Sequence, residues 1–275
     1  DNNFKDITLD SLTLRHRNEI IRMAGVMRDS TYTDVRLDFT HVDIGKLLPQ
    51  VDSLNLSGDI NGRLNILKKR GAYYPSTEIV VEKLNMNDID LGDLKLNITG
   101  NNDLTEYNIT SSLVNANVDT FLAEGKLNVS GSDANLNLDV DFDKFNLQAF
   151  SPFGGEVISN IRGLANGRVK VQGNYKSPDI IGSLTLNNSG MKIPYLNVDL
   201  DLENNTVIAI RKGIFALSPT KVTDTKYDTD ATLRGNITHE NFGEWAMNLT
   251  LDTDRFLVLD TCLLYTSDAA DEEDS

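Results

Sequence analysis

The residue types that most often carry out catalysis or bind metals are few and widely spaced in this chain of 275 residues. Its three histidines, His16, His41 and His239, have no second histidine at the spacing of a metal site. We interpret each of them as a surface or strand-edge residue. Since no nucleophile, acid and base form a catalytic pattern either, the sequence predicts a protein that is not an enzyme and has no cofactor or metal.

A further candidate is the run Asp139-x-Asp141-x-Asp143, which places three carboxylates on one face of a strand. Carboxylates are calcium ligands, but calcium-binding repeats also carry a glycine-bearing loop that this run lacks. A solvated polar strand face is therefore the favoured interpretation.

Two Gly-x-x-x-Gly motifs occur in the chain, at Gly58 and Gly62 and again at Gly163 and Gly167. Membrane helices that dimerise use this spacing, but within an apolar stretch of about 20 residues. Here the flanking residues alternate between polar and apolar. These four residues are therefore interpreted as turn glycines of a repeat, which supply a bulge or a tight bend.

The glycine motifs belong to a longer internal repeat. Asp38-Phe39 and Asp141-Phe142 are offset by 103 residues, as are Pro49 and Pro152, whereas the two glycine motifs are offset by 105. Two residues have therefore entered the second loop. Self-similarity at a fixed period indicates a stacked architecture, in which function usually resides in an extended surface.

Between these motifs, apolar and polar residues alternate along most of the chain. A period of two places one set of side chains on each face of a sheet, so these segments are predicted to be strands with one apolar and one polar face. The residues that we expect on the apolar face, in adjacent segments joined by short turns, are Leu94, Leu96, Ile98, Leu127, Val129, Leu136, Leu138 and Val140.

Helical signals are scarce. Short helical turns are predicted at residues 43–48, before Pro49, and at residues 146–150, before Pro152. The stretch 17–27 is interpreted as part of a strand pair. One continuous β-rich body is expected from about Thr33 to Thr261, with less than about a tenth of its residues helical, far below a typical globular domain.

The last residues, 262–275, break this pattern abruptly. They resemble the translation of a transposase adapter used in short-read DNA libraries; a native acidic tail is the alternative. Adapter-derived residues are excluded from fold reasoning, and we expect this tail to be disordered and dispensable for stability. On this interpretation the only cysteine, Cys262, is not native, and the chain is an internal fragment of a longer protein.

Composition narrows the class of partner. The formal net charge is −15, or −10 without the five acidic residues of the tail, which argues against nucleic acid as a partner. No apolar run reaches the roughly 20 residues that span a bilayer. Any signal or membrane anchor is therefore expected outside this sequence.

The ordered series of motifs resembles the TamB family, of the wider AsmA-like group of bacterial envelope proteins. The resemblance rests on residues 56–64 and 163–173, on Pro178 followed by 182–186, and on 233–261. The richness in asparagine suggests the Bacteroidota branch. The resemblance divides the chain into a repetitive β-sheet region at 1–190, the truncated start of a TamB-like C-terminal domain at 191–261, and the tail at 262–275.

This resemblance implies an all-β fold, in which a long, curved, repetitive antiparallel β-sheet forms a groove and carries one or two very short helices. It also implies a protein anchored to the inner membrane by an N-terminal segment. Such a protein spans the periplasm and serves phospholipid transport to the outer membrane and its assembly, with an Omp85-type barrel as a partner there. The eight apolar residues named above would then line a groove for phospholipid acyl chains.

Three alternatives stay open. The apolar faces could meet each other across a folded-over sheet instead of holding acyl chains. A scaffold for outer-membrane protein assembly or secretion would pair its strand edges with client strands. A cell-surface β-repeat adhesin would share the repeated polar strands.

Overall fold

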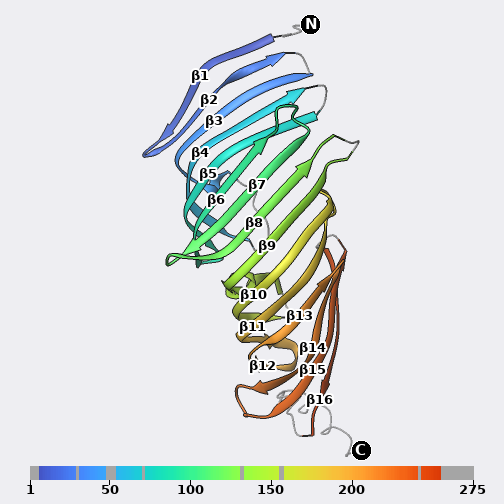
Figure 1. Cartoon of the computed structure of the whole chain (residues 1–275). Coiled ribbons are helices and arrows are strands. Elements are labelled where there is room, and N and C mark those ends of the chain that lie inside the picture. Colours follow the sequence, from blue (N-terminus) through green and yellow to red (C-terminus); the bar gives the residue numbers. More distant parts are fainter. Residues whose placement is uncertain are drawn as a thin grey trace, which may run out of the picture.

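The computed structural model describes residues 6–28, 31–47, 54–69, 72–130, 133–154, 158–240 and 243–254. Within them the chain forms one antiparallel β-sheet of 16 strands with three short 3-10 helices (Figure 1). Helical residues make up 6%. The predicted all-β fold, with very little helix, is confirmed.

The strands lie in the sheet in the order in which they occur in the chain, from β1 at one end to β16 at the other (Figure 1). β12 and β13 share one place, because both pair with β11, end to end, and are separated by residues 203–205. The strands are β1 (Asp6–His16), β2 (Glu19–Arg28), β3 (Tyr32–Asp43), β4 (Leu56–Lys69), β5 (Ala72–Met86), β6 (Ile89–Gly100), β7 (Glu106–Asn115), β8 (Val118–Asn128), β9 (Asn135–Asn146), β10 (Ser159–Asn174), β11 (Asp179–Ile193), β12 (Val198–Leu202), β13 (Thr206–Arg211), β14 (Ile214–Asp224), β15 (Asp230–Glu240) and β16 (Gly243–Asp252).

The N-terminal end of the sheet differs from the prediction. The β-rich body was expected to begin at about Thr33, but β1 and β2 already belong to it, and β2 pairs with β3 from Ile20 to Arg28. The interpretation of the N-terminal stretch as a strand pair is confirmed. The start was placed too late because β2 carries apolar residues on both faces, which hides the period of two. Residues 255–261 of the expected body lie outside the described residues, as does the tail.

The connections between strands lie alternately along the two long sides of the sheet. One side, here called the helical margin, carries η1 (Ile44–Lys46), η2 (Leu147–Gly154) and η3 (Pro194–Leu196). η1 and η2 confirm the two predicted helical turns, whereas η3 was not predicted. The opposite side, here called the turn margin, carries the connections β2–β3, β4–β5, β6–β7, β8–β9 and β10–β11.

The internal repeat recurs in the backbone. β3–η1–β4 is the first copy and β9–η2–β10 the second. In the first copy, a β-bulge gives His41 a positive φ of 50°, and its amide donates to Asn61 Oδ1 at 2.9 Å. In the second copy, Lys144 has the same φ of 50°, and its amide donates to Asn166 Oδ1 at 2.9 Å. Both copies therefore bend a strand at the same place by the same means.

The boundary expected at residues 190/191 falls inside β11, and the sheet continues through it into β12 to β16. Buried apolar residues nevertheless form a separate group beyond this point, around Val198, Leu200 and Val222. A larger group lies between β4 and β11. A third group joins Ala123, Val140 and Val169 to Ile210 across this point, so neither the hydrogen-bonded ladder nor the buried core ends at residues 190/191.

Candidate functional surface

The register of the strands defines two faces, because directly opposed residues on antiparallel strands point to the same side. On one side, here called the apolar face, rows of apolar residues cross the sheet from strand to strand. The longest row passes through β13 rather than β12 and consists of Leu14, Ile21, Phe39, Gly62, Ile79, Leu96, Ser111, Ala123, Val140, Val169, Gly182, Ile210, Phe215, Ile237 and Met247. One serine is the only member that is neither apolar nor glycine.

The register places seven of the eight residues named in the sequence on this apolar face, all except Val129. Leu96 and Val140 belong to the longest row, and Leu94 lies one position towards the helical margin. In the neighbouring rows, Leu127 lies opposite Leu136. Ile98 and Leu138 lie in one row, joined through Ile109 and Gly125. Val129 follows the last residue of β8, and its amide donates to the Thr105 carbonyl at 2.8 Å.

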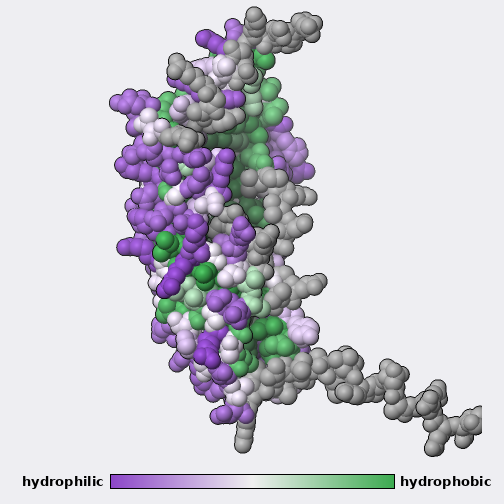
Figure 2. All heavy atoms as spheres, turned by 90° about the vertical axis from the view of Figure 1, so that its right-hand side faces the viewer, coloured by the Kyte–Doolittle hydropathy of each residue, from purple (hydrophilic) through white to green (hydrophobic). Residues whose placement is uncertain are grey.

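Protein atoms cover this face only in part. Of the eight residues, Val140 is buried and the other seven are half-buried. Among the described residues, no second sheet or long helix forms a layer over the face. Figure 2 shows hydrophobic side chains in a band that runs down the molecule, with hydrophilic side chains beside it.

The two margins of the apolar face differ in burial. At the helical margin, strand ends contribute fully buried side chains such as Val42, Ile60 and Leu84. At the turn margin of the first two strands, Ile7 is 49% exposed and Met27 is 43% exposed. From β3 onwards the apolar face is therefore better covered along the helical margin, and Ile7 and Met27 leave it accessible from the turn margin at its N-terminal end.

η2 is the main closure of the helical margin. Ala149 has no exposed surface, and its carbonyl accepts a hydrogen bond of 2.8 Å from Asn87 Nδ2 at the β5–β6 turn. Phe142 contacts Phe121 and Phe145 edge to face, with ring centroids 5.5 and 5.4 Å apart. A pocket of about 240 Å³ remains beside Phe145. It is smaller than a usual ligand site, so the extended face is the better candidate for binding.

The opposite face of the sheet is polar and carries ion pairs between neighbouring strands. Asp141 accepts from Arg168 Nε at 2.6 Å, and Asp139 lies 3.4 Å from Lys170 Nζ. The hydrogen bond to Asp141 is the main reason why the pKa of Arg168 lies above its ordinary value. Two carboxylates of the calcium candidate thus pair with cations. The described residues contain no group of side chains that could hold a metal ion.

The repeat glycines lie inside strands, not in the turns between them. Gly58 in β4 and Gly163 in β10 each sit where the register shifts against the next strand. Gly62 has φ +128°, and a Cβ there would overlap the Glu78 carbonyl oxygen. Gly167 has φ +146°, and a Cβ there would overlap the Ser183 carbonyl oxygen. The placement of these glycines in turns is thus corrected, whereas the register shifts at Gly58 and Gly163 agree with the expected bulge.

The three histidines lie on three different strands. His16 in β1 contacts Glu19 at 3.0 Å, and the amide of His41 in β3 holds the bulge described above. The ring centroid of His239 in β15 lies 5.4 Å from that of Phe215. The register therefore does not bring the histidines together.

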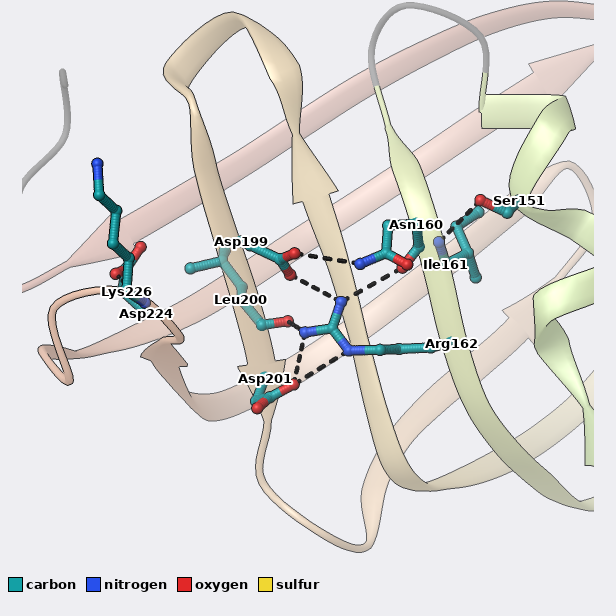
Figure 3. A network of polar contacts seen from close by, with 9 residues as sticks. All are labelled: Ser151, Asn160, Ile161, Arg162, Asp199, Leu200, Asp201, Asp224 and Lys226. Carbon is teal, nitrogen blue, oxygen red and sulfur yellow. Dashed lines mark hydrogen bonds and ion pairs between the residues drawn. The ribbon is translucent and has the colours of Figure 1, made fainter. Parts of the chain in front are cut away.

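One polar cluster was not found by sequence reasoning. From β10, Arg162 reaches across β11 to two aspartates of β12, with its Nη1 2.7 Å from Asp199 and its Nη2 2.5 Å from Asp201 (Figure 3). A side chain at Gly190 would overlap the guanidinium. Desolvation lowers the pKa of Arg162, but the hydrogen bonds to Asp201 and Asp199 outweigh it and raise the pKa above the ordinary value. This clamp ties β10 to β12 across β11.

No known protein family, curated protein or solved structure shows significant similarity to this chain. Within the described ranges, no helix is long and apolar enough to cross a membrane.

Proposed function

We propose that this is an envelope-biogenesis protein that carries phospholipid acyl chains along the apolar face of its sheet. The observation that supports the proposal is the row of apolar residues that crosses the sheet from β1 to β16 without a second layer over it in the described residues. Apolar surface in water costs roughly 25 cal/mol per Å². A hydrocarbon chain removes that surface from water and requires no specific polar partner.

The length of the row suits a carrier better than a single binding site. Neighbouring strands lie about 4.8 Å apart, so fifteen positions extend over roughly 65 Å, about twice the thickness of a bilayer's hydrocarbon core. Such a face offers hydrocarbon a path through water between two membranes. The exposed ends of Ile7 and Met27 give lipids a side from which to enter.

The cellular setting follows from the resemblance of the ordered motifs to the TamB family. On that basis the protein works in the periplasm, anchored to the inner membrane by a segment outside this sequence, and delivers lipid towards the outer membrane. An Omp85-type barrel is the proposed outer-membrane partner.

Photo-crosslinking in cells tests the lipid-carrying proposal. Leu138 is half-buried on the apolar face, and its neighbour Asn137 is exposed on the polar face, so the two positions form a matched pair. A photoreactive residue at position 138 is expected to yield phospholipid adducts by mass spectrometry, and one at position 137 to yield none. Crosslinks from position 138 to this protein alone would mean that the faces close on each other, and would overturn the proposal.

A charge placed on the apolar face gives a second readout. Leu138→Asp puts a carboxylate among hydrocarbon, which costs several kcal/mol unless it is neutralised. The variant should block lipid passage, whereas Asn137→Asp should leave it unchanged. Equal transport by both variants would contradict the proposal.

A second candidate is a scaffold that pairs with client strands. The observation in its favour is the edge of β1, which has one neighbour among the described strands and carries exposed Leu12 and Leu14. An unpaired strand edge is a template for β-augmentation. Crosslinks from Thr13 to outer-membrane proteins, with none to lipid from position 138, would favour this function.

A further inference from the structure

The pocket of about 240 Å³ at the helical margin is in contact with the apolar face. Leu91 and Phe145 line this pocket, and both are buried. The Phe145 ring contacts that of Phe142, a residue of the apolar face, with ring centroids 5.4 Å apart. Val118 also lines the pocket and is 40% exposed. Apolar surface thus extends from the apolar face into a pocket that solvent reaches.

Three segments of the helical margin meet at this pocket. Asp90 comes from the start of β6, Asn115 from the end of β7, and Lys144 from the bulge of β9. The hydrogen bond from Asn87 Nδ2 to the Ala149 carbonyl carries η2 past the β7–β8 connection to the β5–β6 turn. The fold therefore holds around one space residues that lie far apart in the sequence.

The pocket carries one charge of each sign. Lys144 and Asp90 are both exposed. Asp90 Oδ1 accepts a hydrogen bond of 2.9 Å from the Gly92 amide, whereas Lys144 donates through its amide, to Asn166. Among the described residues, neither side chain forms an ion pair. Since binding sites are electrostatically complementary to their ligands, the pocket suits a ligand with both an anionic and a cationic group.

The first copy of the repeat shows what the equivalent corner of the sheet binds. There β2 begins with Glu19, whose carboxylate accepts from Lys46 Nζ at 2.7 Å and from the Asp43 amide at 3.3 Å. In the second copy, Asn146 takes the place of Asp43, and the strand before the repeat, β8, begins with Val118. An apolar residue at a pocket thus replaces the carboxylate that fills the corner in the first copy. An anionic group of a ligand can take the place of that carboxylate.

We infer that this pocket binds the headgroup of a phospholipid that carries both a phosphate and a primary amine. The inference rests on the proposed function and adds a substrate class to it. Lys144 donates to the phosphate, and Asp90 accepts from the ammonium group of the lipid. The acyl chains pass over Val118 and Phe145 onto the apolar face. The pocket is too small for a whole phospholipid, but a headgroup needs less room.

The test measures transfer by the full chain from donor vesicles of phosphatidylcholine that contain one acyl-labelled lipid: phosphatidylethanolamine, phosphatidylglycerol or phosphatidylcholine. Wild-type protein should transfer phosphatidylethanolamine fastest, because phosphatidylglycerol has no amine and the choline group has no N–H donor for Asp90. Asp90→Asn should reduce the preference for phosphatidylethanolamine over phosphatidylglycerol by about threefold, as expected for an exposed ion pair. Lys144→Gln should slow the transfer of both lipids by a similar factor and change the preference less.

The controls change the same residue types nearby, outside the lining of the pocket. Lys83 in β5 is exposed like Lys144, has a similar φ of 53°, and its amide also donates to a side-chain oxygen, at 2.8 Å. Lys83→Gln should leave transfer unchanged, and so should Asp88→Asn in the β5–β6 turn. In Asp90→Asn the new side chain keeps an oxygen for the Gly92 amide. Far-ultraviolet circular dichroism and the melting temperature establish that all variants are folded.

The outcomes separate this inference from the proposed function. Equal transfer of phosphatidylethanolamine and phosphatidylglycerol by wild-type protein, or an equal loss of preference in Asp88→Asn, overturns the headgroup site and leaves the lipid-carrying proposal standing. Transfer of none of the lipids overturns the lipid-carrying proposal and the headgroup site with it. Binding of soluble glycerophosphoethanolamine that disappears in Asp90→Asn, without any preference among lipids, would assign the pocket to a free phosphoamine and overturn the lipid headgroup.

Discussion

The two copies of the internal repeat share a strand framework and differ in the loop that joins the strands. In each copy a phenylalanine lies opposite a glycine, Phe39 against Gly62 and Phe142 against Gly167. In each, an aspartate pairs with the arginine after that glycine, at 2.7 Å in the first copy and 2.6 Å in the second. The bend of the sheet is therefore the property that the repeat retains.

The loops use equivalent residues in opposite ways. Both begin with a side-chain cap, from Asp43 in the first copy and Asn146 in the second. The next turn carries Lys46 in the first copy, which is ion-paired to Glu19 at 2.7 Å, but a fully buried Ala149 in the second. The first loop is thus held at the surface by an ion pair, whereas the second loop contributes a residue to the buried core. The comparison teaches that closure of the apolar face is set by the loops, not by the strands.

The largest effect is expected from the paired glycines. Gly62→Ala and Gly167→Ala each add a Cβ that overlaps a carbonyl oxygen at a positive φ, and each should lower the free energy of unfolding by about 3 kcal/mol. Gly173→Ala is the control, since Gly173 has φ +96° but nothing within 4 Å of an added Cβ. Urea unfolding measures all three. A smaller loss at Gly62 and Gly167 than at Gly173 would contradict the overlap.

A larger side chain in η2 should destabilise only the second copy of the repeat. Ala149→Leu forces a larger side chain into a site with no exposed surface and should cost about 2 kcal/mol. Gln148→Leu, on the neighbouring exposed residue, should cost less than about 0.5 kcal/mol. Hydrogen exchange should show faster opening of β9 and β10 than of β3 and β4 in Ala149→Leu. Equal acceleration in both copies would mean that the loops are coupled.

The two asparagines that accept a hydrogen bond at the bulges should contribute equally to the stability of the fold. Asn61→Ala and Asn166→Ala each remove the acceptor of one backbone amide, and each should cost about 1 kcal/mol or less. Asn97→Ala, an exposed position on the polar face, is the control. Urea unfolding midpoints measure these effects. If the midpoints of Asn61→Ala and Asn166→Ala differ by more than the shift caused by Asn97→Ala, the two copies do not bend in the same way.

The smallest effect on stability is expected at the loop of the first copy, and only at low pH. Hydrogen bonds from Lys46, His16 and the Asp43 amide lower the pKa of Glu19 from 4.5 to about 2. Because the carboxylate is favoured in the folded state, its stabilising effect is present above the ordinary pKa and is lost as pH falls from 4.5 towards 2. Nuclear magnetic resonance titration should show this low value, and Lys46→Gln should raise it. An unchanged pKa in Lys46→Gln would contradict the assigned cause.

Local sequence patterns predicted those features that depend on neighbouring residues. The period of two around Leu94 and Leu138 predicted strands and their apolar side, and the short runs before Pro49 and Pro152 predicted η1 and η2. Features that depend on pairing between distant strands were not predictable. Arg162 reaches Asp201 only because β11 and β12 fold back beside β10. Likewise, Asp90 and Lys144 come to line one pocket only through the order of β6 to β9 in the sheet.

The order of the strands has a consequence for how the chain folds. Almost every strand pairs with the strands next to it in sequence, so each hairpin closes a short loop and loses little conformational entropy of the chain. Folding can therefore start at many hairpins and spread along the sheet, at rates typical of low contact order. At the break between β12 and β13, two short segments must pair with the same neighbours, β11 and β14. We expect propagation to slow there, so that the two sides of this seam fold as separate cooperative units.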